Sequence, residues 1–373
     1  MFTEAQPTAR FNPLSLGGSR LEYPQSQSFD HSPLYWSSLR QTLYSHFPPQ
    51  HDLDLIIGEG RSALFVQSIS NSYHELFVKG LECLNCVGVY LMNDGKLRKA
   101  LPSLRRASVL AQFMGAHRGA SSIKIRQHDP TSKISLETTW SHLNYCERYV
   151  SLLIGLPSPL TKGRFAAPTK PEHETDGEWL EKVHIDICKR VILRNQDDNR
   201  YDLVMTYEID QQLNQAAASL SPDFWQHLEI TPDMTQVDFM SRIISSMSQI
   251  IHYHLLTVLH IPFLHLSTTN HRFDQSKSTC LFACREVLAR FASFRRIVDI
   301  VFCCLWVDFT AFTASMTLLL SHLTFPQQRS EWMLAHQRQS DRALIMKAME
   351  SMDTLNSLNG EADCRDDEDA SLS

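Results

Sequence analysis

The chain has 373 residues, with 35 Lys and Arg against 41 Asp and Glu and a formal net charge of −6. Hydrophobic residues make up 43% of the chain and charged residues 20%, which excludes a wholly disordered protein and allows a large buried core. Only 13 residues are glycine, so the composition disfavours Gly-rich phosphate loops and favours helices. The net negative charge argues against nonspecific binding to a nucleic-acid backbone, which requires a basic surface.

The cysteine content and the first residues bear on the compartment. Nine cysteines are too few for a disulfide scaffold in a chain of this length. Residues 1–7 contain neither the basic segment nor the apolar run of a secretory signal peptide. The sequence therefore predicts a reducing intracellular compartment.

Composition and periodicity divide the chain into three parts. Residues 1–32, rich in Pro, Ser, Gln and Gly, predict a disordered arm or linker. Residues 33–355 carry apolar residues at helical spacing and predict one all-helical domain, and residues 356–373 predict an acidic disordered tail. The fold class is therefore all-α, a large domain of roughly ten or more helices. The expected helices cover residues 64–77, 81–92, 102–114, 136–154, 179–194, 203–220, 235–260, 276–295, 297–323 and 327–355.

Four residues predict where helices begin or end. Pro102 suits the first turn of a helix, where its missing N–H does no harm. Gly115 and Gly155 suit helix C-termini, and Pro262 predicts the end of the helix that starts near residue 235. Asn93-Asp94-Gly95 predicts a further stop.

Cys83 and Cys86 are the one pair with the CxxC spacing of a zinc site. A structural zinc ion requires four ligands, and the next cysteine is Cys146. The pair also lies inside an apolar helical pattern, so we expect structural thiols and no metal. The same interpretation applies to the other close pairs, Cys280 with Cys284 and Cys303 with Cys304.

Four histidines, His252, His254, His260 and His265, lie close together in the sequence and raise the possibility of a helical metal-dependent enzyme. His252 and His254 are two residues apart, so on a helix they point to different faces. No carboxylate lies between Asp238 and Asp274. We therefore expect core or helix-end histidines. No catalytic residue, cofactor site or metal site is predicted, and the chain is not expected to be an enzyme.

Other motifs carry little chemistry. Residues 52–54 (Asp-Leu-Asp) and 58–60 (Gly-Glu-Gly) predict turns, and the chain contains no phosphate-binding loop and no GxSxG motif. Residues 297–325 contain two carboxylates, Asp299 and Asp308, and no Lys or Arg, so a membrane-associated helical protein is an alternative. An aspartate near the bilayer centre is costly, so we expect a helix buried in a bundle.

Two charged regions could contact partners. The densest basic patch comprises Lys96, Arg98, Lys99, Arg105 and Arg106. It lacks interleaved aromatic residues and a groove-reading motif, so we interpret it as a solvated helix face. The acidic residues of the tail indicate a solubilising terminus.

Five sequence motifs occur in an order that matches a known family. Residues 106–118 read RASVLAQFMGAHR, and residues 140–157 read WSHLNYCERYVSLLIGLP. Further along come HYHLL at 252–256 with LHIPF at 259–263, CREVLAR at 284–290 and DFTAFTA at 308–314. Each motif alone is weak, but together they make residues 33–325 resemble the middle homology regulatory domain of fungal zinc-cluster transcription factors.

The resemblance implies structural roles for the motif residues. Those carried over are Arg106, Gly115, His117, Arg118, Trp140, Glu147, Arg148, Gly155, Pro157, His260, Pro262, Asp308 and Phe309. Trp140 and the following residues imply one packed helix, in which the charges of Glu147 and Arg148 pair with neighbouring helices. None of these residues is expected to make or break bonds.

The resemblance also implies a function. The chain is expected to be a fungal transcription regulator in the nucleus, controlling a metabolic or secondary-metabolite gene cluster. The family's six-cysteine DNA-binding module does not occur in this sequence. The expected partners are therefore other transcription regulators or the transcription machinery, with a small-molecule effector as a further candidate. DNA would be reached indirectly or through a missing N-terminal module, and no membrane is expected.

Overall fold

The computed structural model describes residues 71–118, 136–159, 166, 169–172, 174–196, 201–229, 234–268, 270–297, 304–324 and 336–354. Internal contacts divide the chain into two compact units, Met1–His46 and Phe47–Ser373, and all described residues belong to the second unit. The predicted arm, the acidic tail and the turns at residues 52–60 lie outside the described residues. So do residues 64–70 of the first predicted helix.

The described residues contain nine α-helices and no strand, which confirms the all-α fold with slightly fewer helices than ten. Eight of the helices are α3 (Asn71–Asn93), α4 (Leu97–Phe113), α5 (Leu136–Leu153), α6 (Asp176–Gln196), α7 (Leu203–Ala218), α8 (Gln236–Leu264), α9 (Asp274–Ile297) and α10 (Leu305–Thr324). The ninth covers residues 336–354. Short 3-10 helices, among them η2 (Ala116–Arg118) and η4 (Pro222–Trp225), connect some of them.

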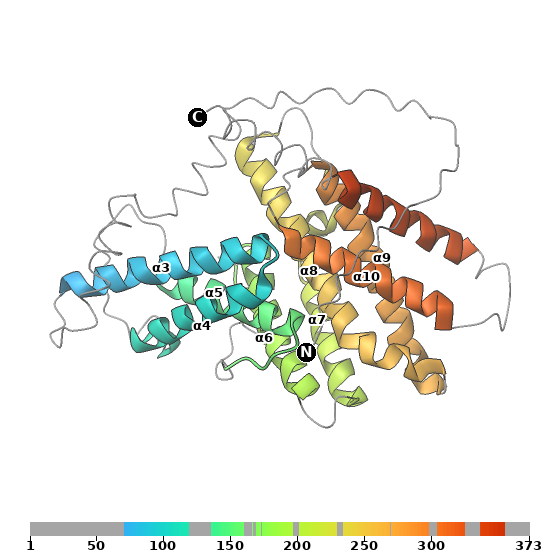
Figure 1. The fold of residues 1–373 in the computed structure, drawn as a ribbon, viewed down its shortest axis with the longest axis horizontal. Helices are drawn as coiled ribbons and strands as arrows, with labels where there is room; N and C mark the ends of the chain where they lie inside the picture. The colour runs from blue at the N-terminus through green and yellow to red at the C-terminus, as the bar shows by residue number, and fades with distance from the viewer. Residues whose placement is uncertain are drawn as a thin grey trace, which may run out of the picture. The chain divides into compact units, whose positions relative to one another are not determined.

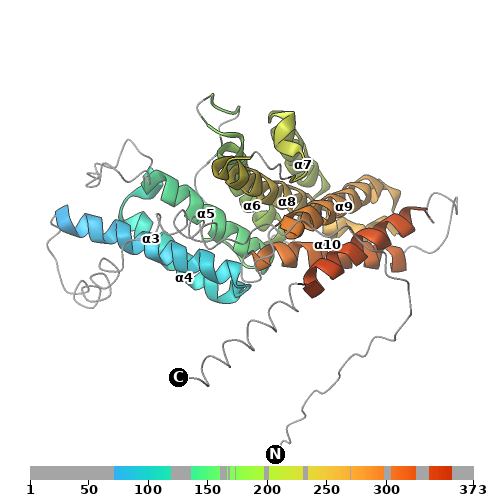
Figure 2. The same ribbon diagram turned by 90° about the horizontal axis from the view of Figure 1, so that it is seen from above.

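The helices pack as two neighbouring groups joined by α6. In the first group α4 packs against α3 and α5 (Figure 1). In the second group α8 and α9 form the most extensive helix pair, and α10 packs against both (Figure 2). Because α6 contacts α5, α7 and α8, it connects the two groups. One hydrophobic core extends from Leu81 in α3 to Ala348 in the last helix.

Glycines in the left-handed region end three helices, as the sequence predicts for Gly95, Gly115 and Gly155. Their φ angles are +69°, +84° and +70°. After α5, the N–H of Gly155 donates to the carbonyl of Leu152 at 3.3 Å, and the N–H of Leu156 donates to the carbonyl of Ser151 at 2.9 Å. This pair of bonds is a Schellman motif, and its central residue needs a positive φ that glycine adopts without strain.

Both proline predictions were wrong, because Pro102 and Pro262 lie inside α4 and α8. The helix α4 begins at Leu97, whose side chain is buried, and the carbonyl of Lys96 accepts hydrogen bonds from Lys99 and Ala100. The helix α8 continues past Pro262 to Leu264, and Phe263 is fully buried. Burial of the flanking residues outweighs the one backbone hydrogen bond that each proline removes.

Residues 297–323 do not form one helix. Ile297 ends α9, and α10 begins at Leu305. One side of α10 is buried, with Val307, Ala311 and Ala314 inaccessible to solvent, whereas the other side is exposed, so the helix is not enclosed as expected. Among the helices of the described ranges, none is long and apolar enough to cross a membrane.

Candidate functional site

Glu147 is a fully buried carboxylate that joins α5 to α4. Its Oε1 accepts hydrogen bonds from Nε of Arg105 at 3.2 Å and from Oγ of Ser151 at 2.9 Å. Its Oε2 accepts from Oγ of Ser158 at 2.6 Å. Arg105 also donates from Nη2 to the carbonyl of Pro157 at 2.6 Å. A buried carboxylate is tolerated only when its oxygens are paired, and these contacts meet that requirement.

Arg148 is also fully buried and joins α5 to α6. Its Nη1 donates to the carbonyl of Ile185 at 3.1 Å. Burial lowers the pKa of its guanidinium, and the nearby negative charge of Asp186 partly opposes that effect. Glu147 and Arg148 therefore connect α5 to two different helices, α4 and α6.

Tyr149 is the next residue of α5 and lies where α5, α8 and α10 meet. Its hydroxyl group and Nδ1 of His254 are 3.1 Å apart. Its ring lies edge-on to Trp306 of α10, with 5.8 Å between the ring centres. Burial lowers the pKa of His254 to about 4, so this histidine is neutral in the folded protein at neutral pH.

A second pair of buried histidines joins α6 to α8. Nε2 of His184 and Nδ1 of His252 are 3.4 Å apart, and Trp225 lies edge-on to His252. Burial, reinforced by the positive charge of Arg290, lowers the pKa of His252 to about 3. Burial also lowers the pKa of His184 well below its usual range. The pair is therefore uncharged and acts as a packed polar contact.

Two more buried arginines hold helices together. Arg194 of α6 donates from Nη1 to Oγ1 of Thr206 in α7 at 2.8 Å and to the carbonyl of Leu259 in α8 at 2.7 Å. Arg295 of α9 forms an ion pair with Asp308 of α10. These bonds connect α6 to both α7 and α8, and α9 to α10.

Asp341 is a buried carboxylate that fixes the last helix, residues 336–354. It accepts hydrogen bonds from Nε of Arg285 in α9 at 2.6 Å and pairs with Nε2 of His322 in α10 at 2.9 Å. Burial alone would raise the pKa of Asp341, but its contacts with Arg285 hold it below the usual range.

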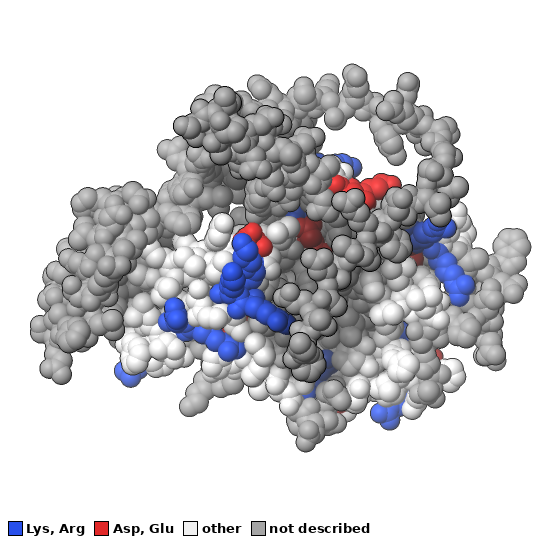
Figure 3. Space-filling view, viewed as in Figure 1, with Lys and Arg blue, Asp and Glu red and all other residues white. Residues whose placement is uncertain are grey.

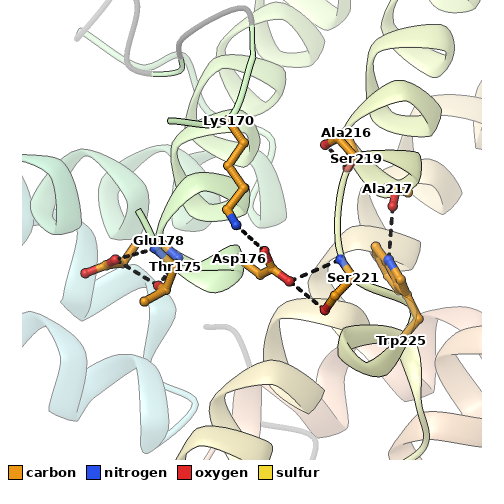
Figure 4. Close-up of polar contacts among 9 residues, drawn as sticks. All are labelled: Lys170, Thr175, Asp176, Glu178, Ala216, Ala217, Ser219, Ser221 and Trp225. Atoms are coloured by element: carbon orange, nitrogen blue, oxygen red, sulfur yellow. Dashed lines mark hydrogen bonds and ion pairs between the residues drawn. The ribbon is translucent and has the colours of Figure 1, made fainter. Parts of the chain in front are cut away.

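The start of α6 is fixed by a capping box and an ion pair (Figure 4). Oε2 of Glu178 accepts from the backbone N–H of Thr175 at 3.0 Å, while Oγ1 of Thr175 accepts from the N–H of Glu178 at 3.3 Å. The carboxylate of Asp176 pairs with Lys170 and accepts from Oγ of Ser221 at 2.8 Å. Asp176 thus connects the segment before α6 to the segment after α7.

The basic patch lies mainly on α4, which has four cationic and no acidic side chains. Figure 3 shows Lys and Arg side chains gathered over this helix. Arg98, Lys99 and Arg106 are exposed, whereas Arg105 is turned toward Glu147. The patch is therefore a solvated face with one member used in the packing.

The structure separates the predicted motif residues into buried and exposed groups. Glu147, Arg148 and His260 are fully buried, Trp140 packs against the core, and Asp308 pairs with Arg295. The exposed motif residues are Arg106, His117, Arg118, Gly155, Pro157 and Phe309, whereas Gly115 and Pro262 are half-buried.

The predicted histidine group does not converge on one point. His252 contacts His184, His254 contacts Tyr149, and Nε2 of His260 lies 3.7 Å from Asp210. Cys83 and Cys86 lie on α3. Within the described ranges, no group of three or more His, Cys, Asp or Glu side chains is placed to hold a metal ion.

No sequence motif indicates the packing roles of Arg105, His184, Arg194 and Arg295, whose partners lie on other helices. The acidic Glu147 and the neighbouring Ser151 signal a buried acceptor, but no sequence pattern indicates which arginine reaches it. The arrangement is a set of polar contacts that fixes the helices relative to one another.

Three curated proteins resemble the chain over most of its length. The dehydrocurvularin biosynthesis regulator of Alternaria cinerariae is 33% identical over 334 residues, which cover 86% of this chain and 44% of that protein. The transcription factor sdnS of Sordaria araneosa is 35% identical, covering 74% of this chain and 36% of its own length. The dehydrocurvularin biosynthesis regulator of Aspergillus terreus is 34% identical, covering 76% and 40%.

The chain is a homologue of fungal transcription regulators. It spans less than half the length of each of these three relatives. No family model and no solved structure matches the chain. The three relatives are named as regulators or transcription factors, which agrees with the prediction of a non-enzymatic protein.

Proposed function

We propose that this chain is the regulatory part of a fungal transcription regulator that controls a secondary-metabolite gene cluster. One observation carries the proposal, the 33% identity to a dehydrocurvularin biosynthesis regulator over 86% of the chain. The metabolite in that name belongs to the relative. What we transfer is the class of function, control of the genes of one biosynthetic pathway.

The described geometry supports a regulatory domain that works by binding other molecules. The motif residues Glu147 and Arg148 form contacts between helices, and Gly115 and Gly155 end helices. We propose that the domain covers residues 33–355, with residues 1–32 as a linker and residues 356–373 as an acidic tail. The motif residues then maintain the shape of the domain, and its surface contacts partners.

The proposed partners are other transcription regulators or the transcription machinery in the nucleus. A small-molecule effector is a further candidate. The chain would reach DNA through a partner or through a DNA-binding module, because its net charge is −6 and binding to a nucleic-acid backbone requires a basic surface. No enzymatic reaction is assigned.

Deletion and overexpression of the gene in its own organism test this proposal. Transcript sequencing should show a coordinated change of several-fold or more in a contiguous group of biosynthesis genes, in opposite directions for deletion and overexpression. A frameshifted copy of the gene serves as the control for overexpression. Transcript levels that stay unchanged, or that change only at scattered genes, would contradict the proposal.

A further inference from the structure

The side chains that the structure describes as exposed on α10 are all apolar, and the half-buried Thr313 lies among them. Five of the exposed side chains follow one line along the helix: Phe309 (41% exposed), Phe312 (55%), Met316 (40%), Leu319 (43%) and Leu323 (80%). We call these five residues the α10 stripe. The neighbouring side chain of Leu320 is also exposed. No Asp, Glu, Lys or Arg belongs to the exposed positions of α10, because Asp308 is turned toward Arg295.

The spacing of the α10 stripe is that of a coiled-coil seam. Successive members are separated by three, four, three and four residues, which is the a and d pattern of the heptad repeat. The stripe extends over about 20 Å of helix, at 1.5 Å per residue. Residues at these positions form a row of side chains that fits between those of a second helix with the same spacing.

We propose that the α10 stripe is a homodimer interface, and that its occupant is the α10 stripe of a second copy of this chain. In a two-fold dimer each copy presents the same patch, so the partner must match the spacing and chemistry of the stripe. A second copy satisfies both conditions, because its own α10 has the heptad spacing and carries no exposed charge that the contact would desolvate.

The exposed area of the α10 stripe reaches the lower limit for such a dimer. A large apolar side chain has roughly 200 Å² of surface, so the uncovered fractions of the five residues leave on the order of 500 Å² exposed per copy. If the contact covered all of this surface, two copies would together bury about 1,000 Å², which is the lower limit for a specific protein interface. A patch of about 500 Å² is comparable with the largest apolar patch of a typical monomer, and such a patch often serves as an interaction surface.

The charges around the α10 stripe do not favour a strongly charged partner. On α10 itself, Asp308 pairs with Arg295 and His322 pairs with Asp341. Both groups are committed within the domain and do not line the stripe. An apolar helix is therefore the matching surface, and this chain supplies one.

The test is the association state of the whole 373-residue chain, measured by sedimentation equilibrium over a concentration series. The variant carries Phe312→Glu and Leu319→Glu, two exposed positions where a charge is tolerated in the monomer but repels its counterpart in a dimer. Phe113→Glu is the matched control, because Phe113 is a helical phenylalanine that is 86% exposed outside the stripe. Circular dichroism at each concentration checks that all three proteins keep their helix content.

We expect the wild type and the Phe113→Glu control to be dimeric, with dissociation constants within two-fold of each other. The double variant should be folded and should have a dissociation constant at least ten-fold higher. A monomeric wild type would overturn the proposal and would indicate that another segment of the chain or a different protein covers the stripe. A dimer that the double variant leaves unchanged would overturn it as well, since the interface would lie elsewhere.

Discussion

Nε of Arg105 in α4 donates to the buried carboxylate of Glu147 in α5 at 3.2 Å. The same guanidinium reaches the carbonyl of Pro157, just beyond the end of α5, at 2.6 Å. Arg105 directly precedes the first family-like motif, which begins at Arg106, and it contacts both Glu147 and Pro157 of the second motif. The helices that carry the two motifs, α4 and α5, therefore pack against each other.

Glu147→Ala should lower the free energy of unfolding by about 2–4 kcal/mol, because it removes the acceptor of Arg105, Ser151 and Ser158. Arg105→Ala should cost only about 1 kcal/mol, since the Arg105 side chain is 35% exposed and its ion pair is screened. Urea denaturation measures both. Arg106→Ala, at the next and exposed position, is the matched control and should stay within about 0.5 kcal/mol of the wild type. A double-mutant cycle with no coupling between positions 105 and 147 would contradict the contact.

The stability of the domain should depend on pH through its buried histidines. His252 and His254 have folded pKa values of about 3 and about 4, below the value of about 6.5 for an unfolded histidine. At pH values between the folded and the unfolded pKa, these histidines are protonated in the unfolded chain but not in the folded chain. The free energy of unfolding is therefore fully retained above pH 6.5 and falls as the pH drops, by about 1.4 kcal/mol per pH unit for each histidine.

Urea denaturation at several pH values between 7.5 and 5 measures this slope. His254→Asn should reduce the slope by about one proton, since it removes one of the titrating groups. His271→Asn, at a side chain that is 98% exposed, is the matched control for the substitution itself. A stability that does not change over this range would show that these histidines are not buried as described.

Two glycines of α3 should respond oppositely to alanine. At Gly80 no described atom lies within 4 Å of an added Cβ, so Gly80→Ala should stabilise the domain by about 0.5–1 kcal/mol through its higher helix propensity. At Gly88 the added Cβ would lie 2.4 Å from Cδ2 of Leu104, which is fully buried. Gly88→Ala should therefore destabilise by about 1–3 kcal/mol. Thermal denaturation should move the two midpoints in opposite directions, and shifts of the same sign would contradict the close packing of α3 on α4.

The 373-residue chain alone should not bind a specific DNA site at physiological salt. Its net charge is −6, and its densest basic region has only a few exposed cations to contact phosphates. Specific recognition also requires an element that reads base edges in a groove. A mobility-shift assay with promoter DNA of the regulated genes measures this binding. A site-specific complex with nanomolar affinity that survives competitor DNA would refute the prediction.

Glycine predicted helix ends correctly in this sequence, whereas proline did not. Gly95, Gly115 and Gly155 each adopt a positive φ, a local requirement that the residue type itself reveals. Pro102 and Pro262 were interpreted as boundaries, but the burial of residues around them keeps both helices continuous. That burial depends on contacts with other helices, which a local pattern does not contain.

The polar contacts show a similar division. Glu147 and Arg148 stand out in the motif, and the structure places both in the interior. Their partners are 42 and 37 residues away along the chain, so only the packing of α4, α5 and α6 determines which groups meet. Arg194 carried no motif, yet it is bonded to both α7 and α8.

Reporter transcription by the tethered chain tests the central claim, that this protein regulates transcription, most directly. The 373-residue chain is fused to an unrelated DNA-binding domain, with and without a separate activation domain, in a fungal host that carries a reporter gene. Glu147→Ala, which weakens the fold, serves as the control, and immunoblotting verifies equal protein levels. The wild-type chain should change reporter output several-fold in at least one fusion, and Glu147→Ala should reduce the change. Output equal to that of the DNA-binding domain alone, and of the activator fusion without the chain, would contradict the account.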